Sequence, residues 1–364
     1  MPATMTTSDM ILNALRAVQD PDLHRDIVSL GFVKDVKVCD GTAALTIELT
    51  TPACPVKDQL KEEARRIVAA LPGIRTVNIA MTAQVRQSLG EKKGALIPGV
   101  RNVVPIASGK GGVGKSTVSA NIAAALVRLG ARVGLMDADV YGPSIPKILG
   151  VQSPPRQGEK GAIIPAEAHG IKVISMGFFM QEEEAVVWRG PMLHKVVNDF
   201  LGMVQWGELD YLIVDLPPGT GDIQLSLCQT IPLTGAAVVS TPQDVALRVA
   251  QKAISMFGKL NTPVLGMIEN MSWYECSHCH QRDEIFGHGG ARQAAERMGI
   301  PFLGEIPLST SVRILSDQGR PVVVVDPDSS QAKAFMGIAE KLAAQVSIRT
   351  MKDLQTAAGP QITF

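Results

Sequence analysis

Four glycines, two lysines and two hydroxyl side chains fall within nine consecutive residues in the first third of the chain. Glycines let the backbone curl so that its N–H groups point inward and bind an anion. Lys115 can reach the outer phosphates of a nucleotide, and the Ser116 hydroxyl can bind a magnesium ion. The spacing therefore predicts a phosphate-binding loop, Gly109-Lys110-Gly111-Gly112-Val113-Gly114-Lys115-Ser116-Thr117.

The segments on either side of this loop are those that such a loop requires. An apolar run at 103–107 predicts a strand before it, and apolar residues on one face of 118–129 predict a helix after it. Gly130 stands where a C-terminal helix cap belongs. Pro105 lies inside the strand and removes a backbone donor, so we expect irregular pairing there.

Aspartates follow two further apolar runs. Asp137 and Asp139 close the strand expected at 132–136, and Asp215 closes the strand expected at 211–214. Asp215 is expected to hold magnesium through water, and Asp139 to orient or deprotonate the attacking water. Asp137 is an accessory candidate. The alternative is that these aspartates only cap helices.

A Cys-x-x-Cys pair, Cys276 and Cys279, lies in a long connection at 271–290. The pair supplies two thiolates, whereas zinc or an iron–sulfur cluster takes four ligands. His278 or His280 could complete the set, as could Cys54 or another cysteine, or a second chain with its own pair. The alternative is a redox dithiol without metal, or two inert cysteines.

Two other residues are ambiguous. Lys110 is a second lysine in a loop that needs one; it is either a solvated surface residue or a contact to nucleotide on a neighbouring subunit. Cys54 lies between two prolines before an expected helix, where the helix dipole favours a thiolate. A buried, inert cysteine fits Cys54 equally well.

The composition and charge of the chain argue against several classes of partner and location. The 364 residues are 46% hydrophobic, and Lys+Arg and Asp+Glu balance at 35 each without a long block of one sign. We therefore expect no nucleic-acid or membrane partner. No apolar run is long enough for a membrane span, and the first residues lack a signal-peptide core, so we expect a cytoplasmic protein. Five cysteines, an odd number, argue against a disulfide framework.

The pattern along the chain predicts two domains. A small α+β domain at 1–85 has a first helix with Ser8 as its N-cap, a second helix over 56–71, and strands at 32–38, 42–49 and 74–83. A linker is expected at 86–100, then an α/β domain at 101–345 with a mostly parallel sheet covered by helices on both faces. Residues 346–364 form an unassigned tail. The expected strands of the larger domain are 103–107, 132–136, 171–176, 211–214, 235–240, 264–269, 302–306 and 322–325.

Taken together, the motifs resemble a known family. The phosphate loop with its extra Lys110 is similar to the deviant Walker A loop of MinD/ParA-type P-loop ATPases. Three further segments and the Cys-x-x-Cys resemble the Mrp/ApbC iron–sulfur cluster carriers, and the N-terminal unit resembles the small domain of iron–sulfur assembly factors, with Cys54 in its cysteine position. The three segments are 137–144, 215–222 and 268–272.

The resemblance implies an ATP-hydrolysing carrier that uses ATP and Mg²⁺. It implies a homodimer in which Lys110 contacts nucleotide across the interface and Asn270 reads the adenine edge. It also implies that Cys276 and Cys279 of two subunits share one labile 4Fe–4S cluster, which passes to apo iron–sulfur proteins with the help of cluster assembly factors.

Two rival functions remain at this level. One is a MinD/ParA-like positioning ATPase, which would need a basic amphipathic C-terminal helix; 346–364 carries only Arg349 and Lys352. The other is a zinc-stabilised nucleotide-binding regulator whose Cys-x-x-Cys is structural, a reading that Ser277, His278 and His280 leave open.

Overall fold

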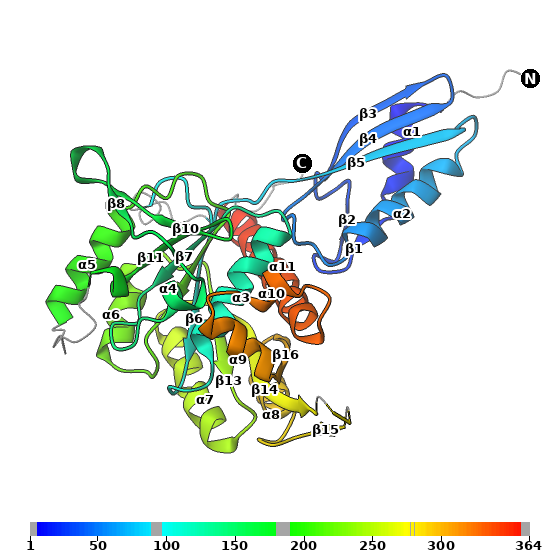
Figure 1. Cartoon of the computed structure of the whole chain (residues 1–364). Coiled ribbons are helices and arrows are strands. Elements are labelled where there is room, and N and C mark those ends of the chain that lie inside the picture. The colour runs from blue at the N-terminus through cyan, green and yellow to red at the C-terminus, as the bar shows by residue number, and fades with distance from the viewer. Residues whose placement is uncertain (1–5, 89–96, 180–189, 277, 280, 358–364) are drawn as a thin grey trace, which may run out of the picture. The chain divides into compact units, whose positions relative to one another are not determined.

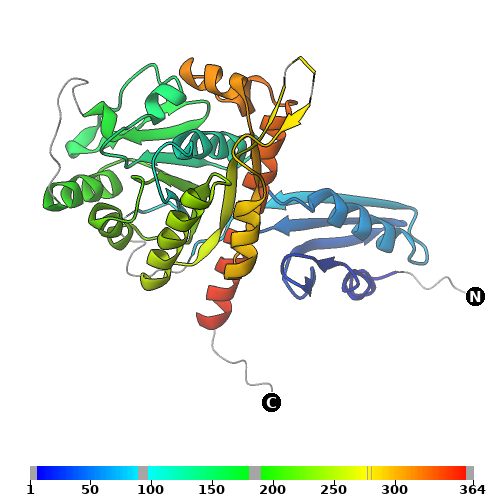
Figure 2. The same ribbon diagram turned by 90° about the horizontal axis from the view of Figure 1, so that it is seen from below.

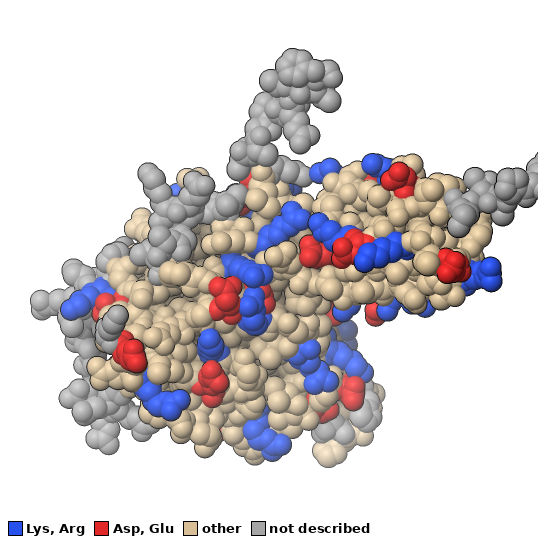
Figure 3. Space-filling view, turned by 90° about the horizontal axis from the view of Figure 1, so that it is seen from above, with Lys and Arg blue, Asp and Glu red and all other residues tan. Residues whose placement is uncertain are grey.

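The computed structural model describes the chain apart from residues 1–5, 89–96, 180–189, 277, 280 and 358–364 (Figure 1). The chain divides into two compact units, Met1–Arg86 and Gln87–Phe364. On the face shown in Figure 3, acidic and basic side chains are interspersed, and neither sign forms a continuous block.

The first unit is a three-stranded sheet covered by two helices. Its central strand alternates half-buried and buried residues, and Ala43, Leu45, Ile47 and Leu49 form the buried face. Strand order is β3-β4-β5, with β3 antiparallel and β5 parallel to β4. The elements are α1 (Ser8–Leu15), β1 (Gln19–Asp20), β2 (Arg25–Asp26), β3 (Val33–Cys39), β4 (Thr42–Leu49), α2 (Lys57–Ala69) and β5 (Thr76–Ala83).

The second unit is built on a nine-stranded sheet. Its order is β10-β11-β7-β12-β6-β13-β14, with β15 and β16 both paired to β14, and all pairs are parallel except those of β10 and β15. Four strands, β6, β7, β12 and β13, are completely buried, as expected for a sheet covered on both faces. The strands are β6 (Val103–Ser108), β7 (Val133–Asp137), β10 (Ala166–Ala168), β11 (Ile171–Ser175), β12 (Tyr211–Asp215), β13 (Ala236–Ser240), β14 (Val264–Glu275), β15 (Arg282–Asp283) and β16 (Phe302–Leu308).

Helices cover both faces of this sheet, as Figures 1 and 2 show. On one face α3 packs on the central strands and α11 packs beside it; α5, α6, α7 and α8 share the hydrophobic core of the other face. The predicted fold class is thereby confirmed. The helices are α3 (Lys115–Arg128), α4 (Ile145–Ile148), α5 (Gly190–Gly202), α6 (Asp222–Thr230), α7 (Asp244–Lys259), α8 (Gly290–Met298), α9 (Thr310–Asp317), α10 (Val322–Val325) and α11 (Ser330–Ala357). Short elements complete the unit: β8 (Arg156–Gln157), β9 (Ile163–Ile164) and 3-10 turns at Glu159–Gly161 and Met176–Phe178.

One predicted strand of this unit is wrong. Val322–Val325 is the short helix α10, in which the carbonyl of Pro321 accepts the N–H groups of Val324 and Val325. Two of its valines are buried where α10 packs against α3 and α11. Packing on helices therefore outweighs the strand preference of a valine run.

The irregular pairing expected at Pro105 is also wrong. Strand β6 pairs with β12 on one side and with β13 on the other without a register shift. Val103 exchanges hydrogen bonds with Thr234 on the β13 side, so the nitrogen of Pro105, two residues on, faces the same way. The β6–β13 pairing starts only at Ile106. Pro105 lies before that point, so the N–H that it lacks is not needed for the pairing.

Two helix ends differ from the sequence analysis. The N-cap of α1 is Thr7, whose side chain accepts the N–H of Met10, and Ser8 is the first helical residue. Helix α11 continues to Ala357, through the first part of the segment left unassigned at 346–364. Val346, Thr350 and Met351 are buried there, and the Thr350 hydroxyl donates to Asn102 Oδ1 of the same unit at 3.5 Å. No described helix is both long enough and apolar enough to cross a bilayer.

Candidate functional site

The phosphate-binding loop joins the buried strand β6 to helix α3. Gly112 and Gly114 adopt left-handed backbone angles, with φ of 79° and 78°, and Gly114 is the N-cap of α3. A side chain on Gly109 would place its Cβ 2.4 Å from the carbonyl carbon of Val249 in α7. Glycine is thus required at these positions for backbone geometry or for close approach.

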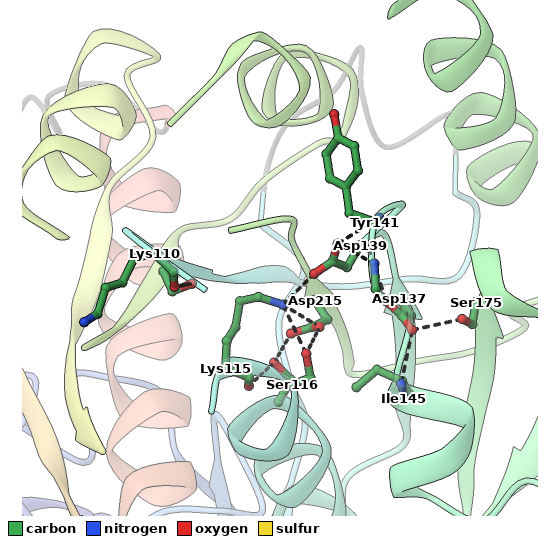
Figure 4. Close-up of polar contacts among 12 residues, drawn as sticks. Lys110, Lys115, Ser116, Asp137, Asp139, Tyr141, Ile145, Ser175 and Asp215 are labelled. Carbon is green, nitrogen blue, oxygen red and sulfur yellow. Dashed lines mark hydrogen bonds and ion pairs between the residues drawn. The ribbon is translucent and has the colours of Figure 1, made fainter. Parts of the chain in front are cut away.

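The side chains of the loop converge on Asp215 at the end of β12 (Figure 4). Lys115 Nζ and Ser116 Oγ each lie 2.6 Å from Asp215 Oδ2, and Ser119 Oγ lies 2.6 Å from Oδ1. Asp215 is completely buried and Lys115 is 6% exposed. The structure therefore brings together the residues that the sequence singled out for phosphate and magnesium, and it adds Ser119, which lies one turn into α3 and belongs to no motif considered above.

Asp137 lies beside this group, at the end of β7, which pairs with β12 so that Asp137 stands next to Asp215. Its Oδ2 accepts hydrogen bonds from Ser175 Oγ at 2.9 Å and from the backbone N–H of Ile145 at 3.2 Å. Burial, together with the negative charge of Asp215, raises the pKa of Asp137 to about 7. Ser175, at the end of the neighbouring strand β11, was not anticipated from the sequence.

Asp139 is placed by the turn after β7. Its Oδ1 accepts the N–H groups of Tyr141 and Gly142, and its Oδ2 lies 3.9 Å from Lys115 Nζ. Burial raises the pKa of Asp139 above its ordinary value, although Lys115 opposes that shift. The carboxylate thus faces the same cluster as Asp215 while staying close to the surface, where Tyr141 is 70% exposed.

Lys110 points away from this cluster (Figure 4). Its Nζ lies 3.4 Å from Gln243 Oε1 at the start of α7, and its backbone carbonyl accepts the Ser108 hydroxyl. Lys110 therefore does not contact the carboxylates that bind Lys115. Its ammonium group lies on the α7 side of the loop.

Asn270 contacts the loop from β14. Its Nδ2 donates to the carbonyl of Val113 at 2.8 Å, and a Cβ on Gly114 would lie 2.3 Å from the same nitrogen. Asn270 lines a cavity of about 520 Å³. The walls also come from the loop, α4, the end of β16 and α9, and include Gly114, Thr117, Ile306, Pro307, Leu308 and Arg313.

The Cys-x-x-Cys lies at the turn of a hairpin. The sequence suggested a long loop after Asn270, but β14 continues to Glu275 and pairs with β15, and the N–H of Cys276 donates to the carbonyl of Gln281. Cys276 is half-buried, whereas Cys279 and His278 are exposed. Ser277 and His280, considered above as part of a metal site, lie outside the described residues.

The hairpin is held at its base by aromatic contacts. The guanidinium of Arg282 lies 4.4 Å from the centre of the Trp273 ring, and the ring of His288 meets Trp273 edge-on at 6.0 Å. These contacts fix the two strands that lead to the cysteines.

Cys54 belongs to the first unit. It is half-buried and precedes α2, and its carbonyl accepts the N–H of Lys57, the first residue of that helix. The remaining cysteines differ from each other: Cys39 is exposed, whereas Cys228 is in the core, where burial raises its pKa to about 12. All five cysteines are free thiols.

Comparison with known families gives two matches along the chain. The model for the NUBPL iron-transfer P-loop NTPase matches residues 99–343, and the model for the iron–sulfur cluster assembly protein matches residues 8–81. The first match spans the phosphate loop, the strand-end aspartates and the hairpin, and the second spans Cys54.

Individual relatives agree with these matches over almost the whole chain. The iron–sulfur cluster carrier protein of Deinococcus radiodurans is 49% identical, over 95% of this chain and 98% of its own. That of a Synechocystis species is 44% identical, over 95% of this chain and all of its own.

Among solved structures, a nucleotide-binding protein from Archaeoglobus fulgidus in complex with ADP is 38% identical with a TM-score of 0.58. The match covers 67% of this chain and 95% of that one. The cell-division ATPase MinD of Pyrococcus furiosus is 25% identical with a TM-score of 0.51, and its match covers 66% of this chain and 97% of that one.

Proposed function

Since the chain belongs to the family of iron-transfer P-loop NTPases that includes the iron–sulfur cluster carrier proteins, we propose that it binds and hydrolyses ATP with Mg²⁺ and carries a labile 4Fe–4S cluster. The cluster is held between two subunits by Cys276 and Cys279 of each, and it is delivered to apoproteins. The work takes place in the cytoplasm, where free thiols stay reduced.

The observation that carries this proposal is that one strand joins the two sites. Strand β14 contacts the phosphate-binding loop through Asn270 and continues to Glu275, next to Cys276. Nucleotide and cysteines therefore share a backbone element. Because Cys279 is exposed at the hairpin turn, a second subunit can approach it and supply the two thiolates that one chain lacks.

In this proposal the loop and its carboxylates form the hydrolytic site. Lys115 binds the β- and γ-phosphates, Ser116 binds magnesium directly, and Asp215 holds it through water. Asp139 orients the attacking water, a role that suits a carboxylate near the surface of the cluster with a raised pKa. When ATP binds, the Lys115–Asp215 contact is replaced: Lys115 contacts phosphate, and Asp215 contacts the hydrated metal.

The base of the nucleotide is placed in the cavity beside Asn270. Nδ2 of Asn270 is bound to Val113, while Oδ1 accepts no hydrogen bond among the described residues, so it is available to the exocyclic amine of adenine. Ile306, Pro307 and Leu308 offer an apolar wall for the ring.

Lys110 is assigned to the partner subunit's nucleotide. It points away from Asp215 in its own chain, and only the Gln243 amide oxygen contacts its ammonium among the described residues. Replacement of Lys110 by alanine should therefore slow ATP hydrolysis while leaving ATP binding to the monomer largely intact. Hydrolysis at the wild-type rate would reject the role across the interface.

The first experiment is to measure iron, sulfide and zinc after anaerobic reconstitution, together with the oligomeric state. We expect about four irons and four sulfides per dimer, abolished by Cys276→Ser. Cys39→Ser is the control because Cys39 is an exposed cysteine of the other unit. One zinc per chain, or iron uptake that ignores Cys276, would make the Cys-x-x-Cys structural and reject the carrier mechanism.

The same experiment separates the carrier from a positioning ATPase, which would hydrolyse ATP without taking up iron. That alternative has little support, because Val346, Thr350 and Met351 of α11 are buried and Thr350 bonds to Asn102 of the same unit.

A further inference from the structure

Two glutamates stand side by side on neighbouring strands near the base of the hairpin. Glu269 of β14 and Glu305 of β16 are directly paired in the parallel ladder, so their side chains project from the same face of the sheet. Like charges placed directly opposite each other destabilise a sheet. A positive charge between them would remove that cost.

The carboxylate of Glu269 is stabilised by hydrogen-bond donors rather than by a cationic side chain. Glu269 is completely buried, and its carboxylate accepts hydrogen bonds from the Ser272 hydroxyl and from the N–H groups of Gly289 and Ala291. Among the described residues no lysine or arginine pairs with it. Arg292, which is half exposed, pairs with Glu305 at 3.8 Å and also lies over the Phe302 ring.

An imidazole completes the group. Gly287 and Gly289 both have left-handed backbone angles, with φ of 84° and 77°, and the tight turn between them brings His288 back to the sheet edge. His288 Nε2 lies 3.0 Å from Glu305 Oε2. One potential ligand atom from each of Glu269, His288 and Glu305 lies within 4.8 Å of the other two.

The second nitrogen of the imidazole also faces a carboxylate. His288 Nδ1 lies 3.8 Å from Glu284 Oε1, which is itself 3.4 Å from Arg282. A histidine that binds a metal through one nitrogen usually donates its other N–H to a carboxylate, which fixes the ring and makes the ligand more basic. Glu284 stands on the Nδ1 side of His288 at ion-pair distance, so a small rotation of either side chain would complete this hydrogen bond.

We propose that Glu269, His288 and Glu305 form a binding site for a divalent first-row transition-metal ion, separate from the cysteines. One imidazole and two carboxylates suit Zn²⁺, Fe²⁺, Co²⁺ or Mn²⁺. Ligand atoms around such an ion lie about 3–4 Å apart, so small rotations of the partly exposed His288 and Glu305 close the site on the fixed Glu269.

The ion would link three segments: β14, β16 and the turn that begins α8. Because Trp273 packs against His288, it would also stiffen the base of the hairpin. The site does not rest on the proposed carrier function, since none of its ligands is a cysteine and all three come from one chain.

The test uses the full-length chain with Cys276→Ser and Cys279→Ser, so that the hairpin thiolates cannot bind metal. Co²⁺ is titrated into the metal-free protein and followed by its visible absorption and by equilibrium dialysis. We expect one Co²⁺ per chain, displaced by Zn²⁺, and a higher melting temperature in its presence. His288→Ala should abolish binding, and Glu284→Gln should weaken it by about tenfold or more.

Two further variants serve as controls for the effect of His288→Ala on Co²⁺ binding. Glu305→Gln preserves the size of the side chain and should also lose Co²⁺ affinity, so a folding defect of His288→Ala cannot mimic the result. His278→Ala removes an exposed histidine from the same hairpin and should leave binding unchanged. Absence of saturable Co²⁺ binding, or binding that survives both His288→Ala and Glu305→Gln, would show that His288 and Glu305 form only an ion pair and would overturn the proposal.

Discussion

The ammonium of Lys115 lies 2.6 Å from the carboxylate of Asp215, and both groups are buried. The next carboxylate, that of Asp139, is 3.9 Å from the same ammonium. A buried ion pair is costly to break from one side only, because the remaining charge has lost its solvent and its partner. The stability of the domain and the chemistry of its phosphate loop therefore depend on the same contact.

Replacement of Asp215 by asparagine should lower the free energy of unfolding by roughly 3–5 kcal/mol, because it leaves Lys115 buried without its main partner. Urea denaturation in the absence of nucleotide measures this loss. The double variant Lys115→Met with Asp215→Asn removes both charges and should recover part of the stability. If it is no more stable than Asp215→Asn alone, the ion pair is not the cause.

Replacement of Ser119 by alanine removes a 2.6 Å hydrogen bond to Asp215 Oδ1 in the core. We expect a loss of about 1–3 kcal/mol in the free energy of unfolding, since a buried acceptor loses one of its donors. Ser255→Ala is the matched control: Ser255 is also helical, but it is exposed and bonds only to the carbonyl of Gln251. Its replacement should change stability by less than about 0.5 kcal/mol.

Gly114→Ala should destabilise the loop even without a ligand. The residue has a φ of +78°, and an added Cβ would meet Asn270 Nδ2 at 2.3 Å. Left-handed strain in a residue other than glycine costs about 1–3 kcal/mol. Gly111→Ala is the control, because Gly111 has open space around it and no left-handed φ. Thermal unfolding should distinguish the two, and equal melting temperatures would contradict this reading of the loop.

The raised pKa of Asp137 predicts that the free energy of unfolding depends on pH. Its pKa is raised from 3.8 to about 7 in the folded protein, so between these values the folded state holds a proton that the unfolded state releases. The contribution of Asp137 to stability should therefore fall as pH rises from about 4 to 7. Asp137→Asn cannot ionise and should flatten this dependence, whereas Asp317→Asn, at an exposed position, should not. Parallel pH profiles for Asp137→Asn and wild type would exclude Asp137 as the source.

The residues that sequence reasoning located are those whose function requires a fixed spacing. The phosphate loop, the aspartates that end apolar strands and the Cys-x-x-Cys are all local patterns, and the ends of parallel strands meet at one sheet edge. These patterns are sufficient to predict that Lys115, Asp139 and Asp215 lie near one another. Their catalytic roles remain predictions.

The residues that were missed depend on contacts between distant segments. Ser119 and Ser175 carry no motif, and only the packing of α3 and β11 brings their hydroxyls to Asp215 and Asp137. The pairing of Glu269 with Glu305 depends on the register of β14 and β16, which shifts on either side of that pair. The Val322–Val325 helix was missed for a different reason: strand preference is a property of the residues, whereas the burial that overrode it belongs to the fold.

Strand β14 changes character at Met271, which has a φ of +57° and follows directly on Asn270. Its pairing with β16 also shifts between Asn270 and Tyr274. The strand thus has two parts that meet at Met271: Asn270, before it, bonds to the phosphate loop, and Cys276 follows the end of the second part. If this chain binds nucleotide as proposed, we expect a tilt about Met271 to displace the thiols at the hairpin turn more than Asn270, because the turn lies farther from the bend.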